Sequence, residues 1–383
     1  MRVLHVYQDF FPSRGGIEDF LLALASESNS HGDDHSVLTA GAFGRTTIDE
    51  VAGIRVVRAA TLGRWFTPLC PTWPRLVQRT GADVLHVHLP CPMAELTALA
   101  VRRSRVHVVV TIHNDYVRPR VAVGAWRPVH LAALRGADRI VTTTHDYADS
   151  SPAIRSLVSA DGRRKSIEDR LVVIPLGIDP REYARRDEKK VREVRARYPV
   201  PLVVFLGRLC YYKGLDVLIE AAALMRQRAI VLVIGGGPCR RGLTRQAAAL
   251  SPESPARVDL AGPLSELDVV AHLHAADLFV LPSTERSEAF GLAQLKAMAC
   301  GVPVVTTDLP GVAWVNRDRE TGLVVPRRDP RALAAALDSL LADEEWRGRL
   351  SAGARERAGQ FTISRMANAY CEVYSELASP RST

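Results

Sequence analysis

Two basic residues lie where an α/β protein could hold a phosphorylated ligand. In the stretch "FLGRLCYYKGLDVLIEAA" (residues 205–222), an apolar strand ends at Gly207, and Arg208 and Lys213 follow before a helix that we expect to begin near Leu215. The N-terminus of a helix contributes positive potential, so two cations placed beside it form an anion site best suited to a diphosphate. From the residues alone, the alternative that both are solvated surface charges stays open.

A second stretch combines a glutamate and a lysine in an unusual setting. The segment "ERSEAFGLAQLKAMACGVPVV" (residues 285–305) starts polar and then becomes almost wholly apolar and small, with Lys296 as the one charge inside it. A helix buried in a core needs neither a glutamate just before its start nor a lysine eight residues later. The positions of Glu288 and Lys296 therefore raise the question of what these two charges face.

Other candidate residues follow other strand-like runs, because ligands of open α/β sheets bind beyond the carboxyl ends of the strands. His113 ends the run "VVVTIHND" and could hydrogen-bond a substrate or share in acid–base chemistry, unless backbone groups satisfy it. His86 and His88 alternate along "DVLHVHLP", and we interpret them as structural. Several glycines allow either close backbone contact with a ligand or simply a tight turn. They are Gly15, Gly16, Gly235, Gly236, Gly237 and Gly262, the last followed by Pro263 and Leu264.

The elements that must position these residues are readable from the apolar pattern. Six short Val/Ile/Leu-rich runs in the first half and six in the second alternate with helical patterns, which is typical of parallel sheets covered by helices on both faces. We therefore predict an α/β protein with two doubly wound domains. The charged stretch "REYARRDEKKVREVRARYPV" marks the boundary, with domains at 1–195 and 196–360. Residues 331–350 have helical spacing, and we expect residues 361–383 to form a helix that crosses back to the first domain.

Length and composition narrow the class of protein. A chain of 383 residues exceeds one hydrophobic core, and no apolar run approaches the roughly 18 to 20 residues that span a bilayer. The start "MRVLHVYQDFF" is interrupted by polar residues and predicts a strand, not a signal peptide. The six cysteines are scattered without metal-ligand spacing, so we expect reduced thiols, no metal site and a cytoplasmic protein.

The chain is basic, with a net charge of +8, and the excess lies mainly in its first half. Residues 1–195 carry 28 basic and 22 acidic groups, whereas residues 196–383 carry 22 and 20. Such a surface suits a phosphorylated substrate or anionic lipid headgroups, unless the charges are simply solvated. No nucleic-acid-binding motif is present. The sequence also lacks the central motifs of P-loop ATPases, zinc proteases, Ser hydrolases and dinucleotide-dependent oxidoreductases.

Taken together, the motifs resemble those of retaining GT-B glycosyltransferases of family 4, the glycogen-synthase-like class. The resemblance runs nearly end to end and rests on "GGIE", "VIPLGIDP", "GRLCYYKGLDVLIEA" and the block "SEAFGLAQLKAMACGVPVV". "TIHNDYVRPR" and "TGLVVPRRDP" look closest to members that extend polysaccharides on lipid-linked carriers, including mannosyltransferases. The family implies two Rossmann-like domains that face a central cleft, with the nucleotide sugar held mainly by the second domain.

By this resemblance, Arg208 and Lys213 contact the diphosphate and stabilise the charge that develops on it as the sugar leaves, without a metal ion or cofactor. Gly15 and Gly16 meet the diphosphate from the first domain, and His113 lies near the donor sugar and the acceptor. Glu288, the first residue of the family's Glu-x7-Glu motif, lies by the transferred sugar. The remaining donor-binding positions that the resemblance implies are Gly262, Leu264, Phe290, Gly291, Leu292 and position 296.

The chain departs from the family at the second glutamate of that motif, which is Lys296 here. The glutamate accepts hydrogen bonds from both ribose hydroxyls, whereas an ammonium group can only donate them. Three outcomes stay open: an active donor site with other contacts, an altered choice of nucleotide, or a weakened or inactive enzyme.

The sequence thus predicts a cytoplasmic glycosyltransferase, with peripheral contact at the inner membrane face as an option. It would move a hexosyl group from GDP-mannose or a UDP-hexose, with retention, to a hydroxyl of a glycan, a lipid-linked saccharide or a specialised metabolite. No nucleic acid is expected as a partner. Two alternatives are a sugar-nucleotide epimerase of the same fold and a nucleotide-binding subunit without catalysis, which Lys296 keeps open.

Overall fold

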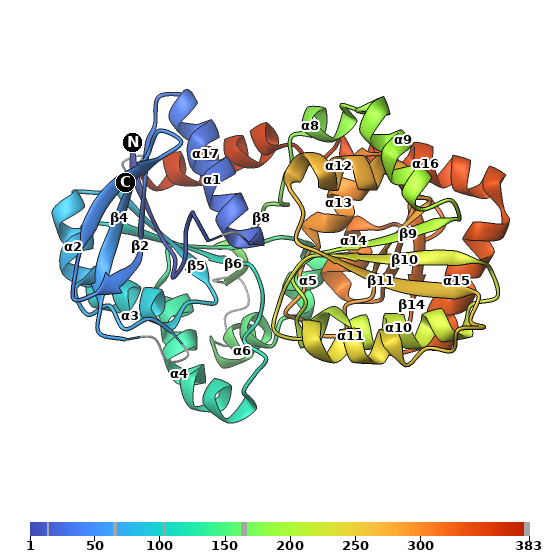
Figure 1. Cartoon of the computed structure of the whole chain (residues 1–383). Helices are drawn as coiled ribbons and strands as arrows, with labels where there is room; N and C mark the ends of the chain where they lie inside the picture. The colour runs from blue at the N-terminus through green and yellow to red at the C-terminus, as the bar shows by residue number, and fades with distance from the viewer. Residues whose placement is uncertain (14, 64–66, 103, 162–166, 379–383) are drawn as a thin grey trace. The chain divides into compact units, whose positions relative to one another are not determined.

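The computed structural model describes residues 1–383 except 14, 64–66, 103, 162–166 and 379–383 (Figure 1). The chain forms two compact units. Unit 1 consists of Met1–Gly177 and Ile363–Thr383, and unit 2 of Ile178–Thr362. Each has its own sheet and its own apolar core. The prediction of an α/β protein with two parallel sheets is therefore confirmed.

Unit 1 is built on an eight-stranded sheet with the order β3-β4-β2-β1-β5-β6-β7-β8. Its strands are β1 (Arg2–Val6), β2 (Asp34–Phe43), β3 (Thr47–Val51), β4 (Ile54–Thr61), β5 (Val84–Leu89), β6 (His107–Ile112), β7 (Arg139–Thr142) and β8 (Leu171–Val173). Its helices are α1 (Gly16–Ser30), α2 (Trp73–Thr80), α3 (Pro92–Val101), α4 (Arg120–Gly136), α5 (His145–Ser150), α6 (Pro152–Asp161) and α17 (Ile363–Ala378). Helices α1 and α17 cover one face of the sheet, and α2, α3 and α4 lie on the other (Figure 1). Every residue of β5 is buried, as expected for a central parallel strand covered on both sides.

The sequence reading missed the edge of this sheet. Strand β3 pairs antiparallel with β4, and β4 in turn pairs parallel with β2. Neither β3 nor β4 was among the six predicted runs of the first half. Strand β3 has the sequence "TIDEV" and no buried residue, so it lacks an apolar signal, whereas β4 ("IRVVRAAT") has buried apolar residues and was overlooked. An exposed, acidic edge strand of this kind is also what protects a sheet edge from pairing with other chains.

Unit 2 is built on a six-stranded, fully parallel sheet with the order β11-β10-β9-β12-β13-β14. Its strands are β9 (Leu202–Leu206), β10 (Ala229–Ile234), β11 (Ala256–Gly262), β12 (Leu278–Leu281), β13 (Val304–Thr307) and β14 (Gly322–Val325). Its helices are α8 (Pro180–Ala184), α9 (Glu188–Arg197), the 3-10 turn η1 (Tyr211–Lys213), α10 (Leu215–Leu224), α11 (Arg240–Ala248), α12 (Glu266–Ala275), α13 (Leu292–Ala299), α14 (Pro310–Val315), α15 (Pro330–Ala342) and α16 (Glu344–Ala358). Figure 1 shows α10 and α11 on one face of the sheet and α12 and α13 on the other.

The boundary between the units lies at 177/178, earlier than the predicted 195/196. The charged stretch lies wholly within unit 2 and contains α9, which the Asp187 carboxylate caps by accepting hydrogen bonds from the backbone N–H groups of Lys189 and Lys190. Helix α9 packs against α12, and Arg195 forms an ion pair with Asp277 at 2.8 Å. The charge that suggested a boundary here belongs to the solvated face of an amphipathic helix.

Two further elements differ from or extend the sequence reading. Residues 331–350 do not form one helix, because Asp343 ends α15 and caps α16 by accepting a hydrogen bond from the backbone N–H of Trp346. The C-terminal helix α17 belongs to unit 1, where it packs on α1 and buries Tyr370 and Tyr374. None of the helices in the described ranges is both long enough and apolar enough to cross a membrane.

Each sheet has one place where the strand order reverses, and this is where open α/β sheets bind ligands. In unit 1 the reversal lies between β1 and β5, and in unit 2 between β9 and β12. The loops after β9 and β12 must therefore lie side by side. These are the two loops that carry Arg208 and Lys213 on one hand and Glu288 on the other.

Candidate active site

The loops after β9 and β12 touch through Gly214. This residue has a φ of 65°, a left-handed conformation that favours glycine. A Cβ atom at this position would clash with the carbonyl oxygen of Pro282 in the loop after β12. The backbone N–H of Thr284 donates to the carbonyl oxygen of Tyr212 at 2.7 Å, which ties the two loops together. The contact leaves room for no side chain other than hydrogen at residue 214.

This junction brings Lys213 and Glu288 into direct contact. The Lys213 ammonium group donates to Oε2 of Glu288, and both side chains are only 11% exposed. The hydroxyl of Ser283 donates to the same carboxylate oxygen at 3.2 Å. Burial opposes a charge on Lys213, but the neighbouring carboxylate raises its pKa above the ordinary value. Lys213 is therefore a cation at neutral pH, and it is held in place by an anion.

Arg208 lies on the same loop but is exposed. Within the described part of unit 2, it makes no hydrogen bond or ion pair, and its charge acts on Cys210 and Tyr212. Burial raises the pKa of the Tyr212 phenol to about 12, and the charge of Lys213 opposes that rise. The loop after β9 thus presents one anchored cation and one cation that is available to an incoming anion.

Helix α13 starts at Leu292, one short segment after Glu288. Gly291 is its N-cap residue, and the side chain of Phe290 is buried, with its ring 5.9 Å from that of Phe361. Gln294 donates from its side chain to the carbonyl oxygen of Phe290 at 2.6 Å, which fixes the approach of the chain to the helix. The aromatic side chain of Phe290 serves the core, whereas the N-terminus of α13, with the half-buried Leu292, lies at the carboxyl end of the sheet and favours anions.

Gly235, the first residue after β10, packs against the ends of the two neighbouring strands. Gly235 donates its backbone N–H to the carbonyl oxygen of Gly262 at 2.8 Å, and a Cβ on Gly235 would clash with the carbonyl oxygen of Gly207. Close backbone packing therefore accounts for at least this glycine. Leu264 follows as a half-buried residue before α12. A hollow of about 470 Å³ lies beside these loops, and it is lined by Gly237, Pro238, Arg240, Arg241, Thr244 and Arg245.

Lys296 does not point toward open solvent. Its ammonium group donates to Oε1 of Glu266 at 2.9 Å and lies 5.5 Å from the centre of the Tyr183 ring. The Tyr183 hydroxyl donates to the same oxygen of Glu266 at 2.7 Å. The structure thus answers the question that the sequence raised: Glu288 faces Lys213, and Lys296 faces a carboxylate on the first turn of α12.

In unit 1, Gly15 is the N-cap residue of α1 and Gly16 is the first residue of the helix. Gly15 has an extended backbone that any residue could adopt, and its carbonyl oxygen accepts the first backbone hydrogen bond of the helix, from Asp19 at 2.9 Å. His113 follows β6, donates its backbone N–H to the carbonyl oxygen of Leu89 at 3.0 Å and packs edge-on against Phe20. Burial lowers the pKa of the His113 imidazole to about 3, so this ring is neutral at physiological pH.

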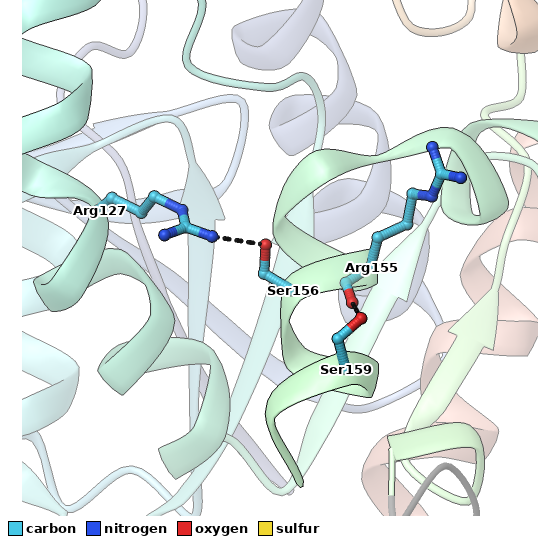
Figure 2. Close-up of a pocket in the computed structure, with 4 residues that line it drawn as sticks. All are labelled: Arg127, Arg155, Ser156 and Ser159. Carbon is cyan, nitrogen blue, oxygen red and sulfur yellow. Dashed lines mark hydrogen bonds between the residues drawn. The ribbon is translucent and has the colours of Figure 1, made fainter. Parts of the chain in front are cut away.

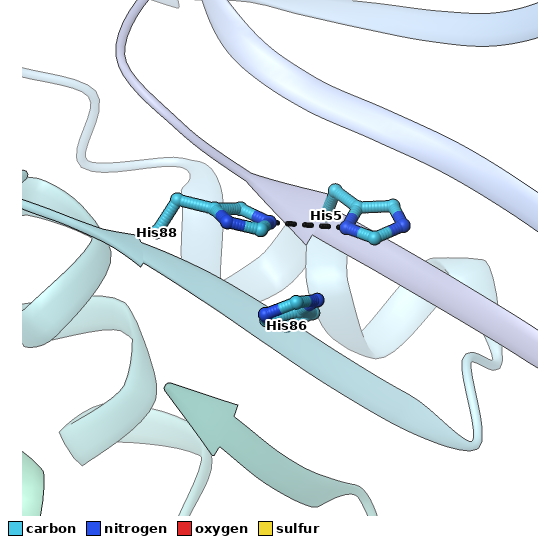
Figure 3. A group of neighbouring side chains, drawn as sticks. All are labelled: His5, His86 and His88. Carbon is cyan, nitrogen blue, oxygen red and sulfur yellow. Dashed lines mark hydrogen bonds between the residues drawn. The ribbon is translucent and has the colours of Figure 1, made fainter. Parts of the chain in front are cut away.

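The histidines read as structural belong to a buried cluster that the sequence did not reveal. His5 of β1 and His86 and His88 of β5 have nitrogens within 4.8 Å of one another (Figure 3). Burial, reinforced by neighbouring imidazoles, holds the pKa of all three well below the usual value. Three imidazoles in contact are also a set of residue types that can bind a transition metal. The prediction that the protein needs no metal stays a prediction.

A second hollow lies in the basic half of the chain. It measures about 360 Å³ and is lined by Arg127 of α4 and by Arg155, Ser156 and Ser159 of α6 (Figure 2). Arg127 donates to the Ser156 hydroxyl at 2.8 Å. The two arginines and two hydroxyls match the chemistry of a phosphate-bearing ligand. The sequence indicated a basic surface in this half but not these residues.

The structure therefore brings together two of the predicted catalytic residues, Lys213 and Glu288, with Arg208 on the same loop. Lys296 forms an ion pair with Glu266, and its predicted place in donor binding stays a prediction. Gly15, Gly16 and His113 belong to unit 1, and the roles predicted for them beside a donor held by unit 2 stay predictions.

Each unit has a mostly parallel sheet, and charged residues follow the strands of unit 2, which is an architecture shared by several classes of two-domain α/β proteins. Comparison with known proteins identifies the class. Residues 187–357 match the family described as glycosyl transferases group 1, and residues 15–177 match the glycosyl transferase 4-like domain. Sucrose-phosphate synthase from Thermosynechococcus elongatus has the same fold, with a TM-score of 0.79, 22% identity, and coverage of 99% of this chain and 100% of that one. The fold is thus GT-B.

Sequence similarity to characterised glycosyltransferases shows the family of the chain. It is 29% identical over 388 residues to O-antigen chain mannosyltransferase C of Escherichia coli, with 100% of each protein covered. It is 32% identical over 362 residues to the GDP-mannose-dependent alpha-(1-6)-phosphatidylinositol monomannoside mannosyltransferase of Mycolicibacterium smegmatis, with 89% of each covered. The chain belongs to the glycosyl transferases group 1 family. It is a glycosyltransferase that takes a glycosyl group from a nucleotide sugar, and the predicted resemblance to GT-B glycosyltransferases is confirmed.

Proposed function

We propose that this protein is a retaining mannosyltransferase that uses GDP-mannose to extend a lipid-linked saccharide, at the cytoplasmic face of a membrane. The observation that carries the proposal is the Lys213–Glu288 pair at the strand-order reversal of unit 2, with the exposed Arg208 beside it. Two relatives are named as mannosyltransferases, one of them dependent on GDP-mannose, and this supports the donor. A UDP-hexose is the alternative donor.

The proposed chemistry starts with cleavage of the bond between the anomeric carbon and the diphosphate oxygen. The bonding electrons leave with the diphosphate, and Arg208 and Lys213 stabilise the negative charge that develops there. An ammonium group has three N–H donors, so the bond from Lys213 to Glu288 leaves two for phosphate oxygens. Because the two side chains supply this positive charge, the proposed mechanism uses no metal ion.

Glu288 acts on the sugar side of the same bond. Its carboxylate carries negative charge next to the anomeric carbon, which becomes positive as the leaving group departs. Lys213 and Ser283 both donate to one carboxylate oxygen, which holds the group in position and lowers its nucleophilicity. We therefore favour attack by the acceptor hydroxyl from the face that the diphosphate leaves. The acceptor oxygen forms the new bond to the anomeric carbon, and its proton passes to the departing diphosphate.

The choice of acceptor is supported by the basic hollow of unit 1. Arg127 and Arg155 could pair with the phosphates of a lipid-linked saccharide, which a neutral metabolite lacks. The relatives are named for acting on an O-antigen chain and on a phosphatidylinositol mannoside, both larger than a small metabolite. A specialised metabolite as acceptor remains the alternative.

The test has two parts. Thermal unfolding is followed in the presence of GDP, UDP, GDP-mannose and UDP-hexoses, because a ligand specific for the folded protein raises its apparent stability. The preferred donor is then supplied with a polyprenyl-diphosphate saccharide, and the anomeric configuration of the product is read by NMR. We expect stabilisation by GDP-mannose and a product with the configuration of the donor. Free nucleotide and an epimerised sugar without any acceptor would instead indicate an epimerase, and stabilisation without any turnover would indicate a binding subunit.

A further inference from the structure

Four histidines of unit 1 form a continuous hydrogen-bonded chain across the middle of the sheet. They are His35 on β2, His5 on β1, His88 on β5 and His113 after β6, which are neighbouring strands in that order. The register pairs Val3 with His35 and His5 with His86, so His35, His5, His86 and His88 point to one face. This is the face that α1 and α17 cover, because Phe20 and Tyr370 pack against its imidazoles.

Three nitrogen–nitrogen contacts join these four imidazoles into one continuous row. Nδ1 of His35 lies 2.9 Å from Nε2 of His5. Nδ1 of His5 lies 3.0 Å from Nε2 of His88, the pair joined by a dashed line in Figure 3. Nδ1 of His88 lies 3.1 Å from Nε2 of His113. His86 is stacked beside this row but is not part of it, because its two nitrogens pair with Thr111 and Tyr374 at 2.7 and 2.6 Å.

All four rings are neutral. Burial lowers the pKa of His35 to about 4 and that of His113 to about 3, and the pKa values of His5 and His88 lie well below the usual value for the same reason. A neutral imidazole has one N–H donor and one acceptor nitrogen. In a chain of such rings, each link uses the donor of one ring and the acceptor of the next. All links must therefore run in the same direction.

The environment of His35, at one end of the row, indicates in which direction the hydrogen bonds run. Nε2 of His35 is buried and has no hydrogen-bond partner among the described residues. If the links ran from His113 toward His35, this atom would carry a buried N–H without an acceptor, which is among the rarest features of folded proteins. If they run from His35 toward His113, it carries only an unused acceptor. The second direction is the less costly one.

We propose that this row of imidazoles fixes His113 in the tautomer with its proton on Nδ1, so that His113 meets the substrate as a hydrogen-bond donor. His35, His5 and His88 are then positioning residues, which act through His113. Each donates from Nδ1 to Nε2 of the next ring, and the last bond occupies Nε2 of His113 as an acceptor. The contact of His113 with the substrate rests on the proposed function; the tautomer does not.

The location of the row agrees with this role. His5 and His88 are fully buried, His35 is 1% exposed, and His113 has the largest exposed fraction of the four, 7%. Its ring is therefore the member from which a proton donor can reach a ligand. A neutral Nδ1–H cannot accept a proton at that atom, so His113 would bind a hydroxyl or phosphate oxygen and would not act as a general base.

The same nitrogens could instead hold a metal ion, and the two possibilities exclude each other. A metal between His5 and His88 needs a lone pair on both facing nitrogens, whereas the chain places a proton between them. Two nitrogens bound to one tetrahedral Zn²⁺ at 2.0–2.1 Å are roughly 3.3 Å apart. The observed 3.0 Å is the separation of a hydrogen bond. Metal content is therefore part of the test.

The first experiment reads the tautomer directly, in the absence of substrate. The full chain is labelled with ¹⁵N in its histidine rings, and His113 is assigned by comparison with His113→Asn. We expect Nδ1 of His113 to be protonated and Nε2 to be a bare acceptor between pH 6.5 and 8. A protonated Nε2, a charged ring, or one equivalent of bound zinc in the purified protein would each overturn the proposal.

The second experiment breaks the row. His5→Phe removes two of its three links with little change in size, and we expect the His113 signals to shift toward a mixture of tautomers. His86→Phe is the matched control, since His86 is equally buried on the same face but lies outside the row. It should leave the His113 tautomer unchanged. If His5→Phe fails to fold, His35→Phe removes only the terminal donor, and the signals of the unaltered protein still decide the direction.

Activity separates this inference from the proposed function. With a donor and acceptor in hand, His5→Phe should lower kcat roughly tenfold and His86→Phe less than about twofold, at equal folded fraction, as expected for one weakened hydrogen bond. An unchanged His113 tautomer in His5→Phe would refute the row as its cause. A correct tautomer together with full activity of His113→Ala would leave the row in place and refute the role of His113 in transfer.

Discussion

The two sheets of this enzyme reverse their strand order in the same way but place different chemistry at the reversal. In unit 2 the polar groups lie on the loops after β9 and β12, and they are charged: Lys213 and Glu288 are paired, and Arg208 is exposed. In unit 1 the polar groups lie along the strands themselves, and they are neutral imidazoles buried under α1 and α17. A loop can place a charge partly in water, whereas a side chain within a central strand must find its partners in the core.

This difference explains which residues could be recognised in advance. Charges at strand ends are visible in a sequence because the apolar run stops there. A histidine within a strand looks like any other buried residue, and its partners lie on strands that are distant in the sequence. The comparison can be tested at both places.

The largest effect should come from acid, and it should fall on unit 1. The buried histidines have folded pKa values below the unfolded value of about 6.5, so the unfolded chain binds protons that the folded unit does not. Stability is therefore lost as the pH falls below about 6.5, by about 1 kcal/mol per histidine and pH unit, until the folded rings titrate near 4 for His35 and 3 for His113.

The measurement is hydrogen exchange at pH 7.5 and 5.5, corrected for intrinsic rates and read peptide by peptide. In unit 2, burial also lowers the pKa of His274, which is about half buried, whereas five deeply buried histidines of unit 1 have lowered pKa values. Peptides of unit 1 should therefore lose more protection than those of unit 2. Equal losses in the two units would contradict the contrast between them.

Removing the anchored cation should have the next largest effect. Lys213→Met leaves the Glu288 carboxylate buried, with the Ser283 hydroxyl as the remaining donor to that oxygen among the described residues. We expect the unfolding free energy to fall by about 3 kcal/mol and kcat by about 10²- to 10³-fold. Arg208→Met is the matched control, because Arg208 is exposed and unpaired within the described residues. It should lower kcat with little change in urea unfolding. Wild-type rates for Lys213→Met would remove this residue from the mechanism.

The junction of the two loops can be tested without touching a charge. Gly214→Ala puts a Cβ into a left-handed position and against the carbonyl oxygen of Pro282, and we expect a loss of about 2 kcal/mol in urea unfolding. Gly124→Ala is the control, because Gly124 lies within helix α4 with no atom within 4 Å of the added Cβ. It should be neutral or stabilising by up to about 1 kcal/mol. A neutral Gly214→Ala would mean that the loops do not depend on this contact.

The smallest effect should come from Lys296. Lys296→Glu replaces the ion pair with Glu266 by two carboxylates that repel each other. If helix α13 contacts the nucleotide, the KM of the donor should change by a factor of about 2 to 10, and kcat should change less. Lys296→Gln removes the attraction without adding repulsion and should lie between the two forms. Identical kinetics for all three forms would exclude a role of position 296 in donor binding.

Much of unit 2 could be predicted before its structure was known. The apolar runs located all six of its strands, and the strand ends located Arg208, Lys213 and Glu288, because a polar residue after a buried strand is a local signal. The domain boundary was predicted too late in the chain, since the charge of "RRDEKKVREVRAR" looks the same on a solvated helix face as in an exposed connection. The partner of Lys296 was not predictable either, because Glu266 belongs to another helix.

By itself, the sequence determined the alternation of strands and helices, the two-sheet architecture and the positions of the charged residues at strand ends. These follow from the local period of apolar residues and from where it stops. Only the tertiary structure decided that β2, β1, β5 and β6 are neighbours, that Gly214 presses on Pro282 and that four imidazoles join in one row. Strand order and contacts between loops depend on residues far apart in the chain, and the free energy that selects them is gained only when the whole core is packed.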